Sequence, residues 1–183
     1  DLSERGSSTS RHPWEIARAR FFVRVLRDHG VVAPGVRVLD VGAGDGYFAG
    51  ALTGACAIDR AGVTLWDTSF TVDDVASLRA RGFTATTSAP EGPFDVAVLL
   101  DVAEHVVDDR AFVADVLARC TPRAHVLFSV PAWPALWSSH DVALKHERRY
   151  TPRAARRLLD DAGLDVLESG GVFHALIAPL LVE

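Results

Sequence analysis

Three glycines at alternate positions directly after a short apolar run are the feature that most constrains the fold. The run is 36–41, and the glycines are Gly42, Gly44 and Gly46. A strand that ends in such glycines can turn sharply and approach a ligand closely, because glycine has no Cβ to clash. Helical periodicity begins again at 47–52, so the segment predicts a strand, a ligand-binding loop and a helix.

Apolar runs alternate with helical periodicity along the rest of the chain. The predicted strands are 36–41, 63–66, 83–87, 94–100, 125–130 and 165–168. The predicted helices begin near residues 14, 47, 73, 108 and 151. Alternation at this spacing requires parallel crossover connections. It predicts an α/β fold, a Rossmann-like open and mostly parallel sheet with helices on both faces and a ligand site at the carboxyl ends of its strands.

An acidic residue, Asp67, closes the second predicted strand, about 20 residues beyond the glycine loop. A carboxylate there can accept hydrogen bonds from both hydroxyls of a ribose, although it could instead cap the following helix. The last glycine of the dinucleotide pattern G-x-G-x-x-G falls on Tyr47. This departure favours another adenosine-type cofactor and leaves a nicotinamide-dependent oxidoreductase as an alternative.

Length and charge narrow the classes of protein. The 183 residues predict one domain over 11–183 after a flexible polar lead-in over 1–10. The formal net charge of -5 gives no general attraction to nucleic acid, which argues against that partner. Cys56 and Cys120 lie far apart and outside metal-ligand spacing, so we expect a reducing, cytoplasmic compartment and no metal site.

The last residues of the sequence form an apolar segment, 172–182, that is too short to span a bilayer. It is compatible with a buried helix, a partner surface or contact with a membrane. Because no seventh strand is recognisable, we expect part of the C-terminal region of the domain to be missing from this sequence.

Two motifs resemble those of a known family. Residues 38–46, VLDVGAGDG, resemble the first motif of the class I S-adenosylmethionine-dependent methyltransferases, and 95–106, DVAVLLDVAEHV, resemble their fourth-strand motif with its Glu-His pair. The similarity runs from about Trp14 to the sixth predicted strand. It is nearest to the small-molecule branch of ubiquinone-type and type 11 methyltransferases, and it implies S-adenosylmethionine as the cofactor.

The resemblance also implies roles for particular residues. Asp40, Gly42, Ala43 and Gly44 would hold the methionine portion of the cofactor, and Arg20 on the first helix would meet its carboxylate. Asp67 would bind the ribose, with Thr68 beside the adenine. Asp101 and Val102 would lie at the end of the fourth strand, beneath the methionine amine. The acid that usually contacts the adenine amino group is replaced here by 88–90, where Ser88, beside Ala89, or Glu91 could substitute.

The acceptor side of the site depends on histidines. Methyl transfer is an in-line displacement, so the protein must align the acceptor and help to deprotonate a hydroxyl. His105 would face the pocket by the resemblance, or serve a packing role. His140 next to Asp141 would form an oriented base, provided that the two neighbours face each other. His146 lies in a charged run and is predicted to be solvated.

Two further features bear on the acceptor. The segment 133–137 carries two tryptophans and two prolines, either as an aromatic wall of the pocket or as an ordinary buried loop. A basic cluster is either a solvated face or a site for an anionic acceptor. Its members are Lys145, Arg148, Arg149, Arg153, Arg156 and Arg157.

The sequence thus predicts S-adenosylmethionine-dependent methyl transfer to a small molecule, with O-methylation favoured by the histidines. A cofactor-binding module without catalysis and an RNA methyltransferase that uses the basic cluster are the alternatives. The oligomeric state and the acceptor are not fixed by the sequence.

Overall fold

The computed structural model describes residues 11–172 and contains two compact units. Unit 1 comprises Asp1–Leu100 and Val116–Phe128, and unit 2 comprises Asp101–Asp115 and Ser129–Glu183. The single domain over 11–183 therefore stays a prediction. The predicted lead-in over 1–10 lies outside the described residues, as does all but the first residue of the apolar segment 172–182.

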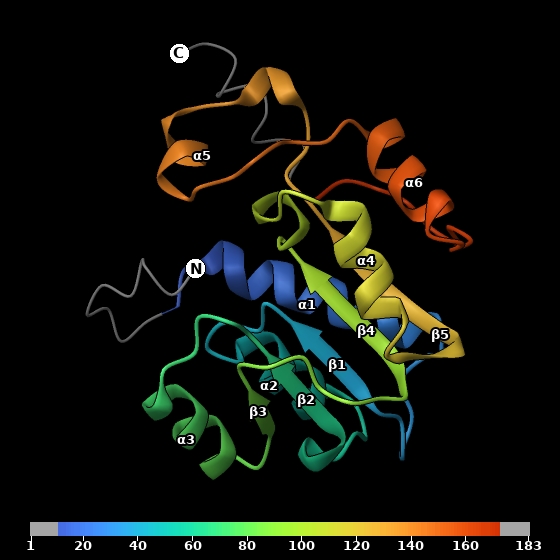
Figure 1. Cartoon of the computed structure of the whole chain (residues 1–183). Helices are drawn as coiled ribbons and strands as arrows, with labels where there is room; N and C mark the ends of the chain where they lie inside the picture. The colour runs from blue at the N-terminus through green and yellow to red at the C-terminus, as the bar shows by residue number, and fades with distance from the viewer. Residues whose placement is uncertain (1–10, 173–183) are drawn as a thin grey trace. The chain divides into compact units, whose positions relative to one another are not determined.

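A five-stranded sheet of order β3-β2-β1-β4-β5 organises unit 1 (Figure 1). The strands are β1 (Val38–Val41), β2 (Val63–Trp66), β3 (Thr84–Thr86), β4 (Phe94–Leu100) and β5 (Cys120–Ser129). β1 lies between β2 and β4, and it pairs in parallel with both. β2 pairs in parallel with β3. The predicted Rossmann-like α/β class is confirmed.

The core of unit 1 explains why these strands are recognisable from the sequence. All four residues of β1 are buried, and β4 is buried from Val96 to Leu99. Such strands are covered on both faces and form continuous apolar runs. The central strands of the sheet are therefore marked by composition alone.

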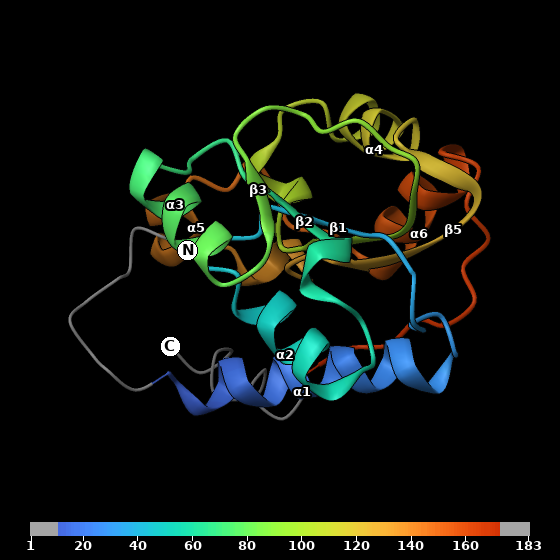
Figure 2. The same cartoon turned by 90° about the horizontal axis from the view of Figure 1, so that it is seen from below.

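Helices of unit 1 begin where side chains satisfy the free backbone N–H groups of their first turns. α1 (Pro13–Asp28) begins after His12 and α3 (Val72–Ala80) after Thr71, each with a capping box. α2 (Tyr47–Ala55) begins after Gly46, which has no side-chain cap, and the Tyr47 amide donates to Asp45 Oδ1 in the glycine loop over 3.1 Å. Figure 2 shows α1 and α2 side by side.

Unit 2 consists of short elements joined by loops. They are η3 (Ala103–His105), the start of α4 (Asp109–Leu117), η4 (Pro134–Leu136), α5 (Ser139–Ala143) and α6 (Pro152–Asp161). An isolated parallel bridge joins Ala132 to Tyr150. The Tyr150 hydroxyl donates to the Asp109 carboxylate over 2.8 Å and to the Ala103 carbonyl over 3.3 Å. Thr151 caps α6, at the position where the sequence predicts a helix to begin.

Two predicted strands differ from the structure. The fifth begins at Cys120 rather than at residue 125. The prediction of a sixth strand over 165–168 is wrong, because that segment has no regular structure. A strand is stable only when it pairs with a neighbour, and Leu167 is 70% exposed, so the apolar pattern there is not matched by burial. Within 11–172, no helix is long and apolar enough to cross a membrane.

Candidate active site

The glycine loop of unit 1 is held at the carboxyl ends of β1 and β2. The Gly42 amide donates to the Trp66 carbonyl over 2.7 Å, and this hydrogen bond joins the start of the loop to the end of β2. Gly44 has a φ of 55° and Gly46 a φ of 69°, in the left-handed region that glycine adopts readily. The loop therefore has the conformation that the three glycines predict.

Asp67 follows β2 and folds back onto this loop. Its Oδ2 accepts from the Gly44 amide over 3.0 Å, while its Oδ1 accepts from the Ser69 amide and hydroxyl over 2.9 and 2.6 Å. The alternative role of capping the next helix is wrong, because Thr71 caps α3. Asp67 thus joins β2 to the glycine loop.

Asp40 on β1 is a buried carboxyl group beside the loop. The residue is 4% exposed, and its Oδ2 has no hydrogen-bond partner among the residues that the structure describes. The pKa of Asp40 is raised to about 7, mainly by burial and in smaller part by the nearby charge of Asp67. A cationic group brought here would restore the ionised form and satisfy the free oxygen.

The arginine that contacts the loop is Arg11, and the role of Arg20 toward the carboxylate of the cofactor stays a prediction. Arg20 lies at an exposed position of α1. Arg11 instead forms an ion pair with Asp45 and stacks over the Tyr47 ring, 4.2 Å from its centroid. No signal in the sequence marks Arg11, because it borders the polar lead-in and its partners lie far along the chain.

Arg81 also contributes to the loop and was not foreseen. Its guanidinium donates to the carbonyl oxygens of Asp45 and Gly46 over 2.7 and 3.1 Å. It therefore fixes the carbonyl side of the turn.

The residues predicted near the adenine lie at exposed positions after β2 and β3. Thr68 follows Asp67, and Ala89 follows Ser88. The Ser88 amide donates to Thr86 Oγ1 over 3.1 Å, and this hydroxyl donates to the Ser88 carbonyl over 3.0 Å. The roles of Thr68, Ser88 and Ala89 stay predictions.

In unit 2, Asp101 and Val102 follow the end of β4. Asp101 has a φ of 57°, and the Ser129 hydroxyl donates to its Oδ1 over 2.8 Å. The Asp101 amide donates to the Ser129 carbonyl over 3.0 Å. Its carboxylate is therefore held in one orientation; the roles of Asp101 and Val102 toward a cofactor stay predictions.

The predicted pair of His140 and Asp141 does not form. Asp141 is fully buried and its Oδ1 lies 2.9 Å from His146 Nδ1, whereas His140 is exposed. The reason is local: Asp141 is the third residue of α5 and turns back to accept from the Ser138 amide over 2.8 Å. Consecutive helical residues point about 100° apart, so His140 faces away.

His146 is the histidine that sequence reasoning missed. It was predicted to be solvated, but its side chain is 7% exposed. Arg149 Nε also donates to Asp141 Oδ1, over 2.7 Å. Burial alone would raise the pKa of Asp141, but the hydrogen bonds from Arg149, His146 and Ser138 outweigh it and hold that pKa well below its usual range.

His105 meets His146 edge to face, with ring centroids 4.7 Å apart. Partial burial and the neighbouring His146 lower the pKa of His105, although the charge of Asp101 opposes them. His105 is therefore mainly neutral at neutral pH and able to accept a proton or donate a lone pair.

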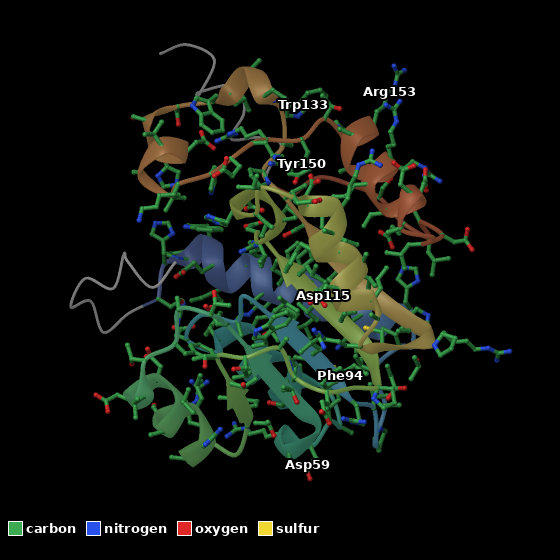
Figure 3. All side chains as sticks on the ribbon, viewed as in Figure 1. Asp59, Phe94, Asp115, Trp133, Tyr150 and Arg153 are labelled. Atoms are coloured by element: carbon green, nitrogen blue, oxygen red, sulfur yellow. The ribbon has the colours of Figure 1, made fainter. Side chains whose placement is uncertain are left out.

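The basic cluster is only partly a free positive surface. Arg148 pairs with Asp109 over 3.0 Å, and Arg149 pairs with Asp141. Figure 3 shows Arg153 projecting away from α6. A cleft of about 300 Å³ lies beside part of this cluster. Its charged lining consists of Asp109, Arg110, Arg148, Arg149 and Arg157.

The segment of two tryptophans is exposed. Trp133 is 45% and Trp137 43% exposed, so the alternative of an ordinary buried loop is wrong. Trp133 has a φ of 63°, and its amide donates to the Tyr150 carbonyl over 2.8 Å. An aromatic wall for an acceptor stays a prediction.

Known proteins are similar to this chain in sequence. A family model described as a methyltransferase domain matches residues 13–169. A probable S-adenosylmethionine-dependent methyltransferase of Mycolicibacterium smegmatis is 29% identical over 147 residues, which cover 75% of this chain and 55% of that protein. An uncharacterized methyltransferase of a Mycobacterium species is 31% identical over 141 residues, 71% of this chain and 56% of that protein. The chain thus spans little more than half the length of these relatives.

Solved structures share the fold. An S-adenosylmethionine-dependent methyltransferase from Clostridium acetobutylicum has a TM-score of 0.62 at 12% identity, covering 82% of this chain and 80% of its own. The (4+2)-cyclase SpnF has a TM-score of 0.62 at 20% identity, covering 88% of this chain and 62% of its own. With the family match, the parallel sheet and the glycine loop, the chain belongs to the class I S-adenosylmethionine-dependent methyltransferases.

Proposed function

We propose that this protein transfers a methyl group from S-adenosylmethionine to a small-molecule acceptor, with an acceptor oxygen as the favoured target. The observation that carries the cofactor assignment is Asp40, a buried carboxyl group with a free oxygen at the foot of the glycine loop. A cofactor that carries an ammonium and a sulfonium supplies the positive charge that this position lacks.

The residues of unit 1 would divide the work of binding. Asp40 would accept from the methionine ammonium, and Gly44, whose Cβ position faces open space, would let the cofactor approach the backbone. Asp67 would exchange its bonds with Gly44 and Ser69 for bonds to the ribose hydroxyls. When bound, S-adenosylmethionine supplies an electrophilic methyl carbon; the protein needs only to position the acceptor and manage its proton.

The histidines of unit 2 are the candidates to remove the proton of a hydroxyl acceptor. His105 has the lowered pKa of a neutral imidazole, which can accept a proton, whereas His140 lacks the orienting bond to Asp141. The cleft that Arg110 and Arg157 help to line would favour an anionic acceptor. RNA is less favoured, because Asp109 and Asp141 already pair with Arg148 and Arg149.

A second candidate is a cofactor-binding protein that performs no methyl transfer. One observation favours keeping it in view: a protein with cyclase in its name shares the fold at a TM-score of 0.62. The fold alone therefore does not fix the reaction, and binding and turnover must be measured separately.

Calorimetric titration with S-adenosylhomocysteine tests the cofactor assignment. We expect binding by the unaltered protein, a loss of at least about tenfold in affinity in Asp67→Ala, and no binding of NADH. Asp59→Ala is the matched control, because Asp59 also accepts from the backbone amide two residues on, over 3.0 Å, but at a site remote from the glycine loop (Figure 3). Equal affinity in Asp67→Ala, or tight NADH binding, would contradict the assignment.

Turnover is tested with a panel of hydroxyl, amine and carboxylate acceptors. Methylated product from hydroxyl acceptors, and its loss in His105→Ala with S-adenosylhomocysteine binding retained, is the expected result. Binding without any turnover would instead support the cofactor-binding module.

A further inference from the structure

Three potential metal ligands meet in unit 2, although they come from two segments of the chain. One ligand atom each from Glu104, His105 and His146 can be chosen so that all lie within 4.8 Å of one another. The Glu147 amide donates to the Glu104 carbonyl over 2.7 Å, and this bond places His146 next to η3. The sequence shows no metal-ligand spacing because the two segments lie about 40 residues apart along the chain and meet only in the folded structure.

The surroundings of His146 resemble those of a metal-binding histidine. Its Nδ1 lies 2.9 Å from the buried Asp141 carboxylate. Histidines that bind metals commonly donate their second ring N–H to a carboxylate, which fixes the tautomer and ring orientation. A proton on Nδ1 leaves the lone pair on Nε2, available for a ligand. Arg149 and Ser138 hold Asp141 in turn.

Glu104 supplies the negative charge of the group. It is fully buried in η3, an unusual place for a carboxylate in a protein of this size. Charges that are buried in proteins are commonly paired with cations or bound to metals. The position of Glu104 beside two imidazoles is thus that of a ligand rather than of a surface acid.

We propose that Glu104, His105 and His146 bind a divalent first-row transition metal ion, with Asp141 as the residue that positions His146. Two imidazoles and one carboxylate are the donor set of three-ligand sites that keep open positions for substrate. Nitrogen donors favour Zn²⁺, Mn²⁺, Fe²⁺ or Co²⁺ over Mg²⁺ and Ca²⁺, which prefer oxygen.

The geometry needs only a small adjustment. Donor atoms bound to one ion at about 2.1 Å lie roughly 3 to 4 Å apart, and the present atoms lie within 4.8 Å of one another. His105 is at an exposed position, whereas Glu104 is buried and the His146 side chain is only 7% exposed, so these two residues would set the position of the ion. The open positions of the ion would then lie on the exposed side, where His105 is.

The role of the ion in catalysis rests on the proposed function. A hydroxyl acceptor that binds the ion loses its proton to solvent more readily, because the cation stabilises the alkoxide. An O–CH₃ bond then forms as the S–CH₃ bond breaks, which leaves S-adenosylhomocysteine. With an ion bound, His105 would be one of its ligands, and this role would replace the role of base that the proposed function gives His105 in the absence of an ion.

Titration of the chelator-treated protein with Co²⁺, followed by visible absorption, tests the site directly, and Zn²⁺ calorimetry gives the affinity. We expect one ion per chain. We also expect affinity to fall about 100-fold or more in His146→Ala and Glu104→Gln, and about 10- to 100-fold in Asp141→Asn. His140→Ala removes an exposed histidine of the same unit and should leave metal binding unchanged. Circular dichroism melting checks that each variant folds, and His105→Ala, at an exposed position, replaces any variant that does not.

Absence of binding by the folded protein, or equal binding in the ligand variants and the unaltered chain, would overturn the proposal. S-adenosylhomocysteine titration of the same samples keeps the two proposals apart, because cofactor binding involves other residues. Methyl transfer that survives complete chelation would overturn the catalytic role of the ion.

Discussion

Two buried aspartates, one in each unit, differ in what surrounds their charge. Asp40 in unit 1 is 4% exposed, and its Oδ2 has no partner among the described residues; its pKa rises to about 7. Asp141 in unit 2 is fully buried but bound by Ser138, His146 and Arg149, which hold its pKa below the usual range. Both carboxyl groups are thus buried, but their pKa values shift in opposite directions.

The two carboxyl groups therefore have different roles: that of Asp40 can bind a ligand, whereas that of Asp141 holds neighbouring side chains in place. A carboxylate whose partners are within the fold stabilises the native state in its ionised form. A carboxyl group buried without such partners costs stability when it ionises, and a cationic ligand removes this cost. Asp40 therefore marks the binding site, and Asp141 marks the scaffold.

The largest effect is expected at Asp141. Asp141→Asn leaves the half-buried Arg149 without its counter-charge, and breaking such a pair costs about 3 to 5 kcal/mol. Because the native pKa of Asp141 is lowered, this stabilisation is full above its unfolded value of 3.8 and is lost as pH falls further. Urea unfolding at pH 7 measures it. Asp160→Asn is the control, since its pair with Arg156 is exposed, and a loss as small as in that variant would contradict the scaffold role.

The opposite sign is expected at Asp40. Its native pKa of about 7 exceeds its unfolded value of 3.8, so the cost of ionisation is absent at low pH, grows between these values and is complete above pH 7. A shift of about 3 units corresponds to a ceiling of about 4 kcal/mol. We therefore expect Asp40→Asn to unfold at higher urea than the unaltered protein at pH 8 and to lose this advantage near pH 4. An advantage independent of pH would show that Asp40 is not the source.

Cofactor binding should release a proton from Asp40. At pH 7 its carboxyl group is about half protonated, and a ligand ammonium requires the ionised form. Calorimetry with S-adenosylhomocysteine in buffers of different ionisation enthalpy should therefore report release of roughly half a proton at pH 7 and much less at pH 9. Proton uptake would contradict this account of the site.

The smallest effect is expected at Arg11, in the ion pair at the rim of the glycine loop. The Arg11 and Asp45 side chains are 29% and 39% exposed, so solvent screens their pair, and Arg11→Ala should cost about 0 to 1 kcal/mol. Thermal melting at low and high salt measures the change. The control is Arg24→Ala, whose pair with Asp28 is more exposed and should contribute less.

The sequence predicted the parts of the molecule that local pattern determines. The apolar runs of β1 and β4 and the glycines between β1 and α2 are contiguous in the chain, so their burial and backbone geometry follow from composition and spacing. Asp67 could be found for the same reason, because the carboxyl ends of β1 and β2 meet at one edge of the sheet.

Contacts between distant segments could not be found in this way. His146 lies beside His105 because bonds such as those from Glu147 to Glu104 and from Tyr150 to Ala103 join two segments that are distant in the sequence. His140 was preferred because it adjoins Asp141 in sequence, but a helix turns neighbours apart. Residues 165–168 have the composition of a strand without a neighbour to pair with, and only tertiary structure reveals that lack.

Two of the loop glycines, Gly44 and Gly46, differ in how much substitution they should tolerate. A Cβ at Gly44 would meet nothing within 4 Å, so only its backbone conformation opposes a side chain, and Asn could adopt it. A Cβ at Gly46 would lie 2.8 Å from Leu78 Cδ2 and 3.1 Å from Leu65 Cδ1, in addition to requiring a positive φ. Position 46 is thus constrained by the core beneath the loop rather than by the ligand above it. Substitution at position 46 should therefore reduce stability, whereas substitution at position 44 should act mainly on the approach of the cofactor.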